Sequence, residues 1–115
     1  MFNVKKYNYS EKSNPILTVI ITFRTNGNYD MVDRLTYRKY HGDDIEFLVV
    51  DDGSKPEDCE KARKICQEHG FNFIQIDSGE ELFSAGRARN CGAINARTKF
   101  IVHEDIDLYP PQGYY

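Results

Sequence analysis

Two short runs of apolar residues restrict the fold of this chain more than any other feature. They are Leu17–Phe23 (LTVIITF) and Ile45–Val50 (IEFLVV), and both are rich in β-branched side chains. An apolar run of this length is typical of a strand that is buried on both faces, as in a parallel sheet. Each run ends in turn-forming residues, and a segment with helical spacing follows. The chain is therefore expected to contain parallel strands joined by helices.

The same alternation continues to the end of the chain. Further strands are expected at Phe71–Ile76 and Phe100–His103, and helices at about 29–40, 57–69 and 84–96. The order β-α-β-α-β-α-β with short connections predicts an α/β fold with a parallel sheet and right-handed crossovers. Residues 1–15 are polar and rich in tyrosine, and they predict an arm that precedes the domain.

Helical spacing also predicts which side chains turn toward the sheet. In the first helix they are Met31, Leu35 and the aliphatic stem of Arg38. In the second helix they are Cys59, Ala62, Ile65, Cys66 and His69, and Gly70 is the expected stop signal. The third helix is rich in small residues, namely Ala85, Ala88, Ala93 and Ala96, so we expect it to be able to pack close to the sheet.

Composition and charge exclude several classes of protein. At 115 residues the chain is one domain or part of one. The net charge of −3 does not favour nucleic acid or an anionic membrane as a partner. No apolar run approaches the ~20 residues of a membrane span, and the start lacks the apolar segment of a signal peptide. Three cysteines, an odd number, favour a reducing compartment, so a cytoplasmic location is expected.

The densest group of acids follows the last strand, in the stretch KFIVHEDIDLYP. Glu104, Asp105 and Asp107 repel one another there, and burying them unpaired would be costly. The cluster is tolerable if it stays hydrated, pairs with arginine or holds a hard cation such as Mg²⁺ or Mn²⁺. A hydrated acidic turn is the plain alternative to a metal site.

Polar groups also follow two other strands. Thr22-Phe23-Arg24 ends the first strand, and Asp51-Asp52-Gly53-Ser54 follows the second. Ligands of open parallel sheets bind outside the carboxyl ends of the strands. An aromatic face, a cation, a hydrogen-bond acceptor and an acid pair are what a nucleoside diphosphate with a divalent cation requires. Singly, Phe23 suits the core, Arg24 the surface and the Asp-Asp-Gly stretch a turn.

Several common sites lack their sequence motifs. No glycine-rich dinucleotide fingerprint follows the first strand, and no phosphate loop G-x-x-x-x-G-K-[ST] is present. The three histidines lack zinc-ligand spacing, and there is no Gly-x-Ser-x-Gly elbow. A dehydrogenase and a P-loop NTPase are therefore disfavoured. A receiver-like signalling domain stays open because Asp51-Asp52 follows a buried strand, although no lysine ends a fifth strand.

In order and spacing these segments resemble the N-terminal, nucleotide-sugar-binding half of GT-A glycosyltransferases, specifically glycosyltransferase family 2. LTVIITFRTN is similar to the family's first strand, and IEFLVVDDGS is similar to its second strand with an acidic end. GRARNCGAINARTKFIVHEDIDLYP is similar to its Ala-Arg-Asn-x-Gly helix and Asp-x-Asp strand. The resemblance covers about residues 17–110 and implies a Rossmann-like α/β half-domain.

The resemblance implies a nucleobase pocket at the first two strand ends. Thr22, Phe23 and Arg24 would line this pocket, and Asp52 would hydrogen-bond the edge of the base. The chain has Thr-Phe-Arg-Thr where the family usually has Pro-x-Tyr-Asn, so the residue that stacks on the base stays open.

The resemblance also implies sites for the diphosphate and a metal. Arg87 or Arg89 would approach the base or the diphosphate. Asp105 would lie near the ribose or the metal, and Asp107 would coordinate the Mn²⁺ or Mg²⁺ that bridges the diphosphate. The metal would neutralise charge on the departing nucleoside diphosphate while an acceptor hydroxyl attacks the sugar.

The implied function is donor binding by a glycosyltransferase that uses a nucleotide-diphosphate sugar, expected to be a UDP-sugar. Its acceptor would be a saccharide in surface polysaccharide synthesis, with the full-length protein in the cytoplasm or peripheral at the inner membrane face. Residues 16–115 would form the N-terminal part of the domain, truncated before the acceptor half, with the catalytic base beyond Tyr115. The chain alone is then expected to be inactive, and the alternative is a non-catalytic nucleotide- and metal-binding module.

The last strand has a further implication in this reading. In the family, the second half of the domain pairs beside the strand that corresponds to Phe100–His103. Without that neighbour the strand would present an apolar edge, and such edges pair readily with another chain. We therefore expect self-association of the chain through this edge.

Overall fold

The computed structural model describes residues 3–25, 32–38, 42–77 and 84–106. Within these residues, five strands form one sheet: β1 (Asn3–Tyr7), β2 (Leu17–Phe23), β3 (Ile45–Asp52), β4 (Asn72–Asp77) and β5 (Phe100–Asp105). Their order in space is β1-β4-β3-β2-β5. The pairs β4–β3, β3–β2 and β2–β5 are parallel, and β1 pairs antiparallel with β4. The α/β class with a largely parallel sheet is confirmed.

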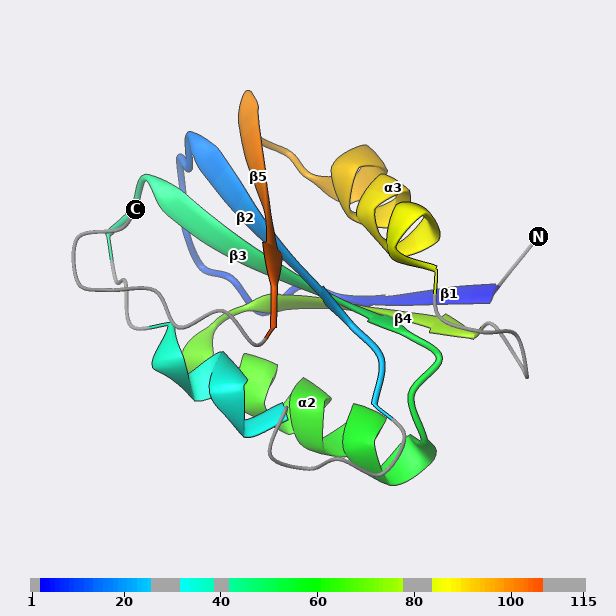
Figure 1. The fold of residues 1–115 in the computed structure, drawn as a ribbon. Coiled ribbons are helices and arrows are strands. Elements are labelled where there is room, and N and C mark those ends of the chain that lie inside the picture. The colour runs from blue at the N-terminus through cyan, green and yellow to red at the C-terminus, as the bar shows by residue number, and fades with distance from the viewer. Residues whose placement is uncertain (1–2, 26–31, 39–41, 78–83, 107–115) are drawn as a thin grey trace.

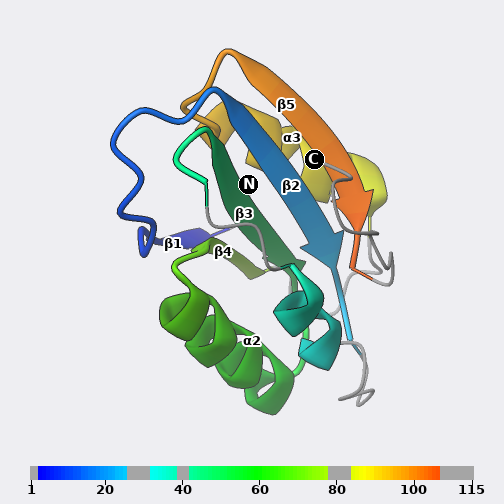
Figure 2. The same cartoon turned by 90° about the vertical axis from the view of Figure 1, so that its left-hand side faces the viewer.

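Helices cover both faces of the sheet (Figure 1). The 3-10 helix η1 (Arg34–Tyr37) and the helix α2 (Pro56–His69) contact each other on one face, and α3 (Ala85–Asn95) lies on the other. Figure 2 shows β2 and β5 side by side, with β3 along the opposite edge of β2. Strand β2 therefore has later strands of the chain on both of its edges, β3 on one and β5 on the other.

The alternation of side chains on β2 divides the core into two layers. Val19 and Ile21 are fully buried on the α2 face, where they join Ala62 of α2 in one apolar cluster. Ile20 points to the opposite face and joins Ala88 of α3 in a second cluster. Because successive residues of a strand face opposite sides, an unbroken apolar run is what a doubly covered strand needs. The interpretation of LTVIITF as such a strand is confirmed.

Both long helices begin at residues suited to that position, and α2 also ends at one. Helix α2 has Pro56 in its first turn and ends at Gly70, whose φ of 72° lies in the left-handed region. Gly70 is thus the stop that the sequence predicts. Helix α3 starts after Ser84, whose hydroxyl accepts a hydrogen bond from the Arg87 backbone N–H at 3.1 Å.

The structure differs from the sequence predictions at several points. His69 is exposed, so its predicted inward orientation is wrong, because it lies in the last turn at the rim of the helix. In the first predicted helix, Leu35 and Arg38 are buried as expected, while Met31 lies outside the described residues. Residues 3–7 of the predicted polar arm form β1, an edge strand that the sequence analysis did not predict.

Strand β5 is the last strand of the described sheet and remains exposed. Phe100, Ile101 and Val102 are 54%, 39% and 37% accessible to solvent, although an apolar run of this kind is typical of a covered strand. No helix in the described ranges packs over this run to the extent that α3 covers β2 and β3 (Figure 1). The exposed edge agrees with the expected geometry, and self-association through it stays a prediction.

The small residues of α3 let this helix approach the sheet closely. A Cβ atom at Gly92 would lie 2.5 Å from Cγ2 of Ile20 and 3.4 Å from Cγ2 of Val50. Both of these sheet residues are fully buried and have no room to withdraw. Glycine at position 92 therefore sets the spacing between α3 and the sheet.

We predict that Gly92→Ala destabilises the fold by about 1–3 kcal/mol, because the added methyl group overpacks the interface with Ile20. Gly86→Ala is the matched control, since among the described residues a Cβ there meets the Ser84 hydroxyl alone, at 3.9 Å, and the position is exposed. It should be neutral or stabilising by up to about 1 kcal/mol through helix propensity. Urea unfolding followed by circular dichroism measures both, and equal effects of the two variants would contradict the spacing role.

Candidate functional site

The candidate site lies where the carboxyl ends of β2, β3 and β5 meet. Strand pairing places Thr22 beside Asp105 and Phe23 beside Asp51. The order of strands reverses between β2 and β5, because β3 and β4 lie on one side of β2 and β5 lies on the other. Open α/β sheets bind ligands at such a switch point. The three predicted strand ends are thus neighbours in space.

The face of the sheet sorts these residues into two groups. Thr22, Asp52 and Asp105 share the face that α3 covers, as the register of the three strands and the alternation of side chains require. Asp51 and Glu104, their neighbours in sequence, point to the face covered by α2 and η1. The predicted ligands Asp52 and Asp105 therefore lie on the same side as the two predicted arginines of α3.

Asp52 forms the most fully bonded contact of this group. The Arg87 guanidinium donates from Nε to Oδ1 at 2.8 Å and from its terminal nitrogen to Oδ2 at 2.7 Å. Ser84 N–H donates to Oδ2 at 2.9 Å. The Asp52 side chain has no exposed area, while that of Arg87 is partly exposed. A bidentate pair of this kind fixes both the loop after β3 and the start of α3.

Asp105 and Arg89 lie at the open side of the same face. Their charged groups are 3.8 Å apart, and the side chains are 70% and 47% exposed. At this exposure the pair is a weak, hydrated contact that a ligand can replace. The sequence analysis allowed an acid of this turn to be hydrated, paired with arginine or bound to a cation. Asp105 is exposed to solvent and therefore agrees with the first of these alternatives.

Glu104 instead pairs with an arginine. Its carboxylate is buried and contacts the Arg38 guanidinium, with Nε to Oε1 at 2.8 Å. The sequence analysis allowed pairing with arginine but did not identify the arginine, because 66 residues separate the two partners. Long-range pairing of this kind leaves no local signal in the sequence.

The residues predicted to line a nucleobase pocket are placed differently from one another. Thr22 is buried on the α3 face, and Arg24 is half-buried just after β2. Phe23 lies on the opposite face, 2% exposed and packed in the core cluster beneath α2. The structure therefore brings Thr22 to Asp52 and Asp105 but does not bring Phe23 to them. The strand's two-residue alternation is the physical reason.

A model of the family described as glycosyltransferase like family 2 matches residues 18–112 of the sequence. The chain belongs to this family. The match runs from β2 past the end of β5 and includes every strand end described above. It confirms the family resemblance drawn from the motifs, and the mixed α/β sheet agrees with a Rossmann-like GT-A half-domain. No curated protein sequence gave a significant match to the chain.

Of the two metal ligands predicted for this glycosyltransferase-like chain, Asp105 lies in the described part of the structure. The described ranges contain no cluster of three or more His, Cys, Asp or Glu side chains arranged to hold a metal, and Asp107 lies outside those ranges. Glu104 is engaged by Arg38, so Asp105 and Asp107 are the acids of this turn with a ligand role open to them. A Mg²⁺ or Mn²⁺ bound to nucleotide phosphates takes only one or two protein carboxylates. The exposed carboxylate of Asp105 fits that requirement.

Two loops of the site are joined by side chains to which the sequence analysis assigned no ligand role. The Thr25 N–H donates to the Ser54 hydroxyl at 2.8 Å, and the Thr25 hydroxyl donates to the buried carboxylate of Asp58. Ser54 N–H donates in turn to Asp51 Oδ1 at 2.9 Å. The Asp-x-x-Ser spacing was a local signal for this last bond, since such turns are common. The loops after β2 and β3 are thereby held together.

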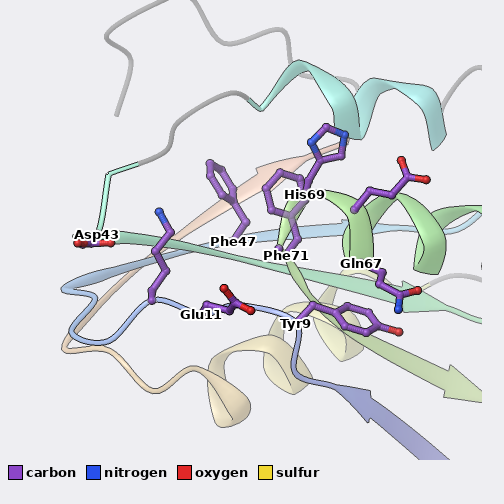
Figure 3. Close-up of a pocket in the computed structure, with 10 residues that line it drawn as sticks. Tyr9, Glu11, Asp43, Phe47, Gln67, His69 and Phe71 are labelled. Atoms are coloured by element: carbon purple, nitrogen blue, oxygen red, sulfur yellow. The ribbon is translucent and has the colours of Figure 1, made fainter.

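A hollow lies at the end of the sheet opposite the candidate site, where β3 and β4 begin (Figure 3). Its volume is about 530 Å³, and its lining includes Tyr9, Glu11, Phe47, His69 and Phe71. Phe47 and Phe71 are almost fully buried, and their rings are tilted against each other with centroids 4.9 Å apart. This hollow is remote from the strand ends that carry the family motifs.

Within the described ranges, no helix has both the length and the apolar character needed to cross a bilayer.

We predict that Arg87→Ala destabilises the fold by about 2–4 kcal/mol, because it removes two charge-assisted hydrogen bonds from the buried carboxylate of Asp52. Arg89→Ala removes a similar side chain from the same helix and should change the stability by less than about 0.5 kcal/mol. Urea unfolding at pH 7 measures both free energies. Equal losses of unfolding free energy in the two variants would show that the Asp52–Arg87 pair contributes no more to stability than the exposed Asp105–Arg89 pair.

Asp51 gives the structure a pH dependence. Burial raises the pKa of this carboxyl above its ordinary value, against hydrogen bonds from Ser54 that lower it. Below about pH 3.9 both the folded and the unfolded chain hold the proton, so there is no penalty. As the pH rises toward the higher folded value, the unfolded state loses its proton first and is favoured. The charge of Asp51 therefore costs stability above the ordinary aspartate pKa.

We predict that Asp51→Asn gains stability relative to the wild type as the pH rises from about 4 to about 7. The reason is that asparagine has the shape of aspartate without its charge in the same buried position. Unfolding by urea at several pH values gives the difference between the two proteins. A difference that does not change with pH over this range would contradict the buried-acid assignment.

Proposed function

We propose that this chain is the donor-binding region of a glycosyltransferase that binds a nucleotide-diphosphate sugar, a UDP-sugar, with a divalent cation. The observation that carries the proposal is the common placement of Thr22, Asp52 and Asp105 with two arginines of α3, on one face at the switch point of the sheet. A hydrogen-bond acceptor, two cations and an exposed acid in one place are suited to a base, a diphosphate and a metal.

The residues divide the ligand between them in this proposal. In the Asp52–Arg87 pair, Arg87 receives the edge of the nucleobase, since its side chain is partly exposed while the buried Asp52 carboxylate holds it in place. Arg89, half exposed, approaches the diphosphate. Asp105 and Asp107 hold Mn²⁺ or Mg²⁺, which neutralises charge on the diphosphate leaving group. The acceptor is a saccharide, in the context of surface polysaccharide synthesis.

Titration calorimetry with UDP, with and without Mn²⁺, tests the proposal on the intact chain. Binding is expected to be at least about tenfold tighter with Mn²⁺, since the cation joins the acids of the protein to the phosphates. Asp105→Ala and Asp107→Ala should remove most of this gain and leave metal-free binding unchanged. The Asp105 side chain is 70% exposed, so its removal should not disturb the fold.

Two further variants separate the site from general effects of charge. Asp52→Asn should weaken UDP binding both with and without metal, because the proposed base contact does not depend on the cation. Asp43→Ala removes an exposed acid at the opposite end of β3 and should leave both affinities within about twofold. UDP binding that is indifferent to Mn²⁺, or equally affected by Asp43→Ala, would overturn the proposal.

A further inference from the structure

Arg38 is a buried cation with several hydrogen-bond partners. It directly follows η1, and its side chain and that of Glu104 are 0% and 1% exposed. Besides Glu104 it contacts three backbone carbonyl oxygens: those of Arg34 at 2.7 Å, Asp105 at 2.9 Å and Ile106 at 3.0 Å. A guanidinium has five N–H donors. The contacts to Glu104 and to the carbonyls account for all five.

Two of these carbonyls belong to the turn that carries the acids. Strand β5 ends at Asp105, opposite Thr22 of β2, and the backbone of Ile106 has passed the last strand partner. The Arg38 bonds to Asp105 O and Ile106 O therefore continue the fixation of the backbone beyond the sheet. The Ile106 side chain is also buried, in the cluster beneath α2.

The result is an acid held between two anchored neighbours. Glu104 and Ile106 both point into the α2 face, where Arg38 and the core hold them. Asp105 lies between them and points to the α3 face, with 70% of its side chain exposed. Arg38 also cancels the charge of Glu104, so this acid does not add its repulsion to that of Asp105.

A contribution to stability does not by itself account for the buried Arg38–Glu104 pair. A buried ion pair can often be replaced by apolar residues of similar size with little loss of stability, since desolvation offsets the attraction. What an apolar pair cannot supply is a set of donors to two carbonyl groups in fixed directions. The arginine fork is rigid and planar, whereas a lysine offers a single point charge.

We propose that Arg38 is a positioning residue of the donor site: from the opposite face of the sheet, it fixes the Glu104–Ile106 turn so that Asp105 is presented to the metal and diphosphate. This inference rests on the proposed function for the ligand, and on the contacts above for the turn. Arg38 itself touches no ligand. Groups that orient metal ligands from behind commonly change metal affinity by about 10- to 100-fold when removed.

The decisive variant replaces the whole pair, as Arg38→Met with Glu104→Met, so that no charge is left buried alone. We expect its urea midpoint to stay close to that of the wild type, and its Mn²⁺-dependent UDP affinity to fall about 10- to 100-fold. Metal-free UDP affinity should change less than about twofold, because the Asp52–Arg87 pair on the other face is intact. Arg38→Lys, which keeps the charge and loses the fork, should retain the fold and lose part of the metal-dependent gain.

A matched pair at the other end of the sheet provides the control. Arg97 binds the buried carboxylate of Glu46 through Nε and a terminal nitrogen, at 3.0 and 2.8 Å. Arg97→Met with Glu46→Met removes the same chemistry far from the acidic turn and should leave both UDP affinities within about twofold. Equal losses in the two double variants would overturn the assignment of a positioning role to Arg38.

Amide hydrogen exchange tests the turn without any ligand. In the Arg38→Met/Glu104→Met variant, we expect the amides of residues 104–106 to exchange at least about tenfold faster, with the β2–β3 pairing unchanged. Unchanged exchange at these amides would overturn the positioning role even if UDP binds. Wild-type protein that binds UDP without any Mn²⁺ dependence would instead overturn the proposed function, and with it the purpose assigned to the turn.

Discussion

The two-residue period of a strand governs the whole carboxyl end of this sheet. Two pairs of adjacent acids, Asp51-Asp52 and Glu104-Asp105, stand at the ends of neighbouring strands, and in each pair the sheet separates the members. The first member enters the α2 face and is enclosed there, by a turn for Asp51 and by Arg38 for Glu104. The second member enters the α3 face and meets an arginine of α3. Residues of one charge, adjacent in sequence, thus have different environments.

Arginine is the partner of three acids that are buried at an end of the sheet, namely Glu46, Asp52 and Glu104. Arg87 joins the start of α3 to β3, Arg38 joins η1 to the end of β5, and Arg97 joins the segment after α3 to the start of β3. Each pair connects segments that are far apart in the chain and lie at the rim of the sheet, where backbone hydrogen bonding ends. The apolar layers provide most of the stability, and the ion pairs define the directions in which the rims are held.

The sequence was most informative where burial on both faces leaves a local pattern. The runs LTVIITF and IEFLVV predicted β2 and β3, and Gly70 predicted the end of α2. Strand β1 was missed because NVKKY is short and polar, and only its pairing with β4 makes it a strand. The motifs identified Asp52, Arg87, Arg89 and Asp105 as one group, and the structure places them on one face. Phe23 was misleading because a motif does not say which face of the strand a side chain takes.

The position of β2 in the sheet also bears on how the chain folds. Although β2 comes early in the sequence, one of its two edges is completed only when Leu17 pairs with Phe100, and β1 likewise waits for β4. During synthesis the most apolar strand of the protein therefore remains half-paired until nearly all the described residues have emerged. Such distant pairings give a high contact order, which slows folding and exposes the strand to incorrect partners. The arrangement that creates the switch point for ligand binding thus also delays the completion of β2, the strand beside that switch point.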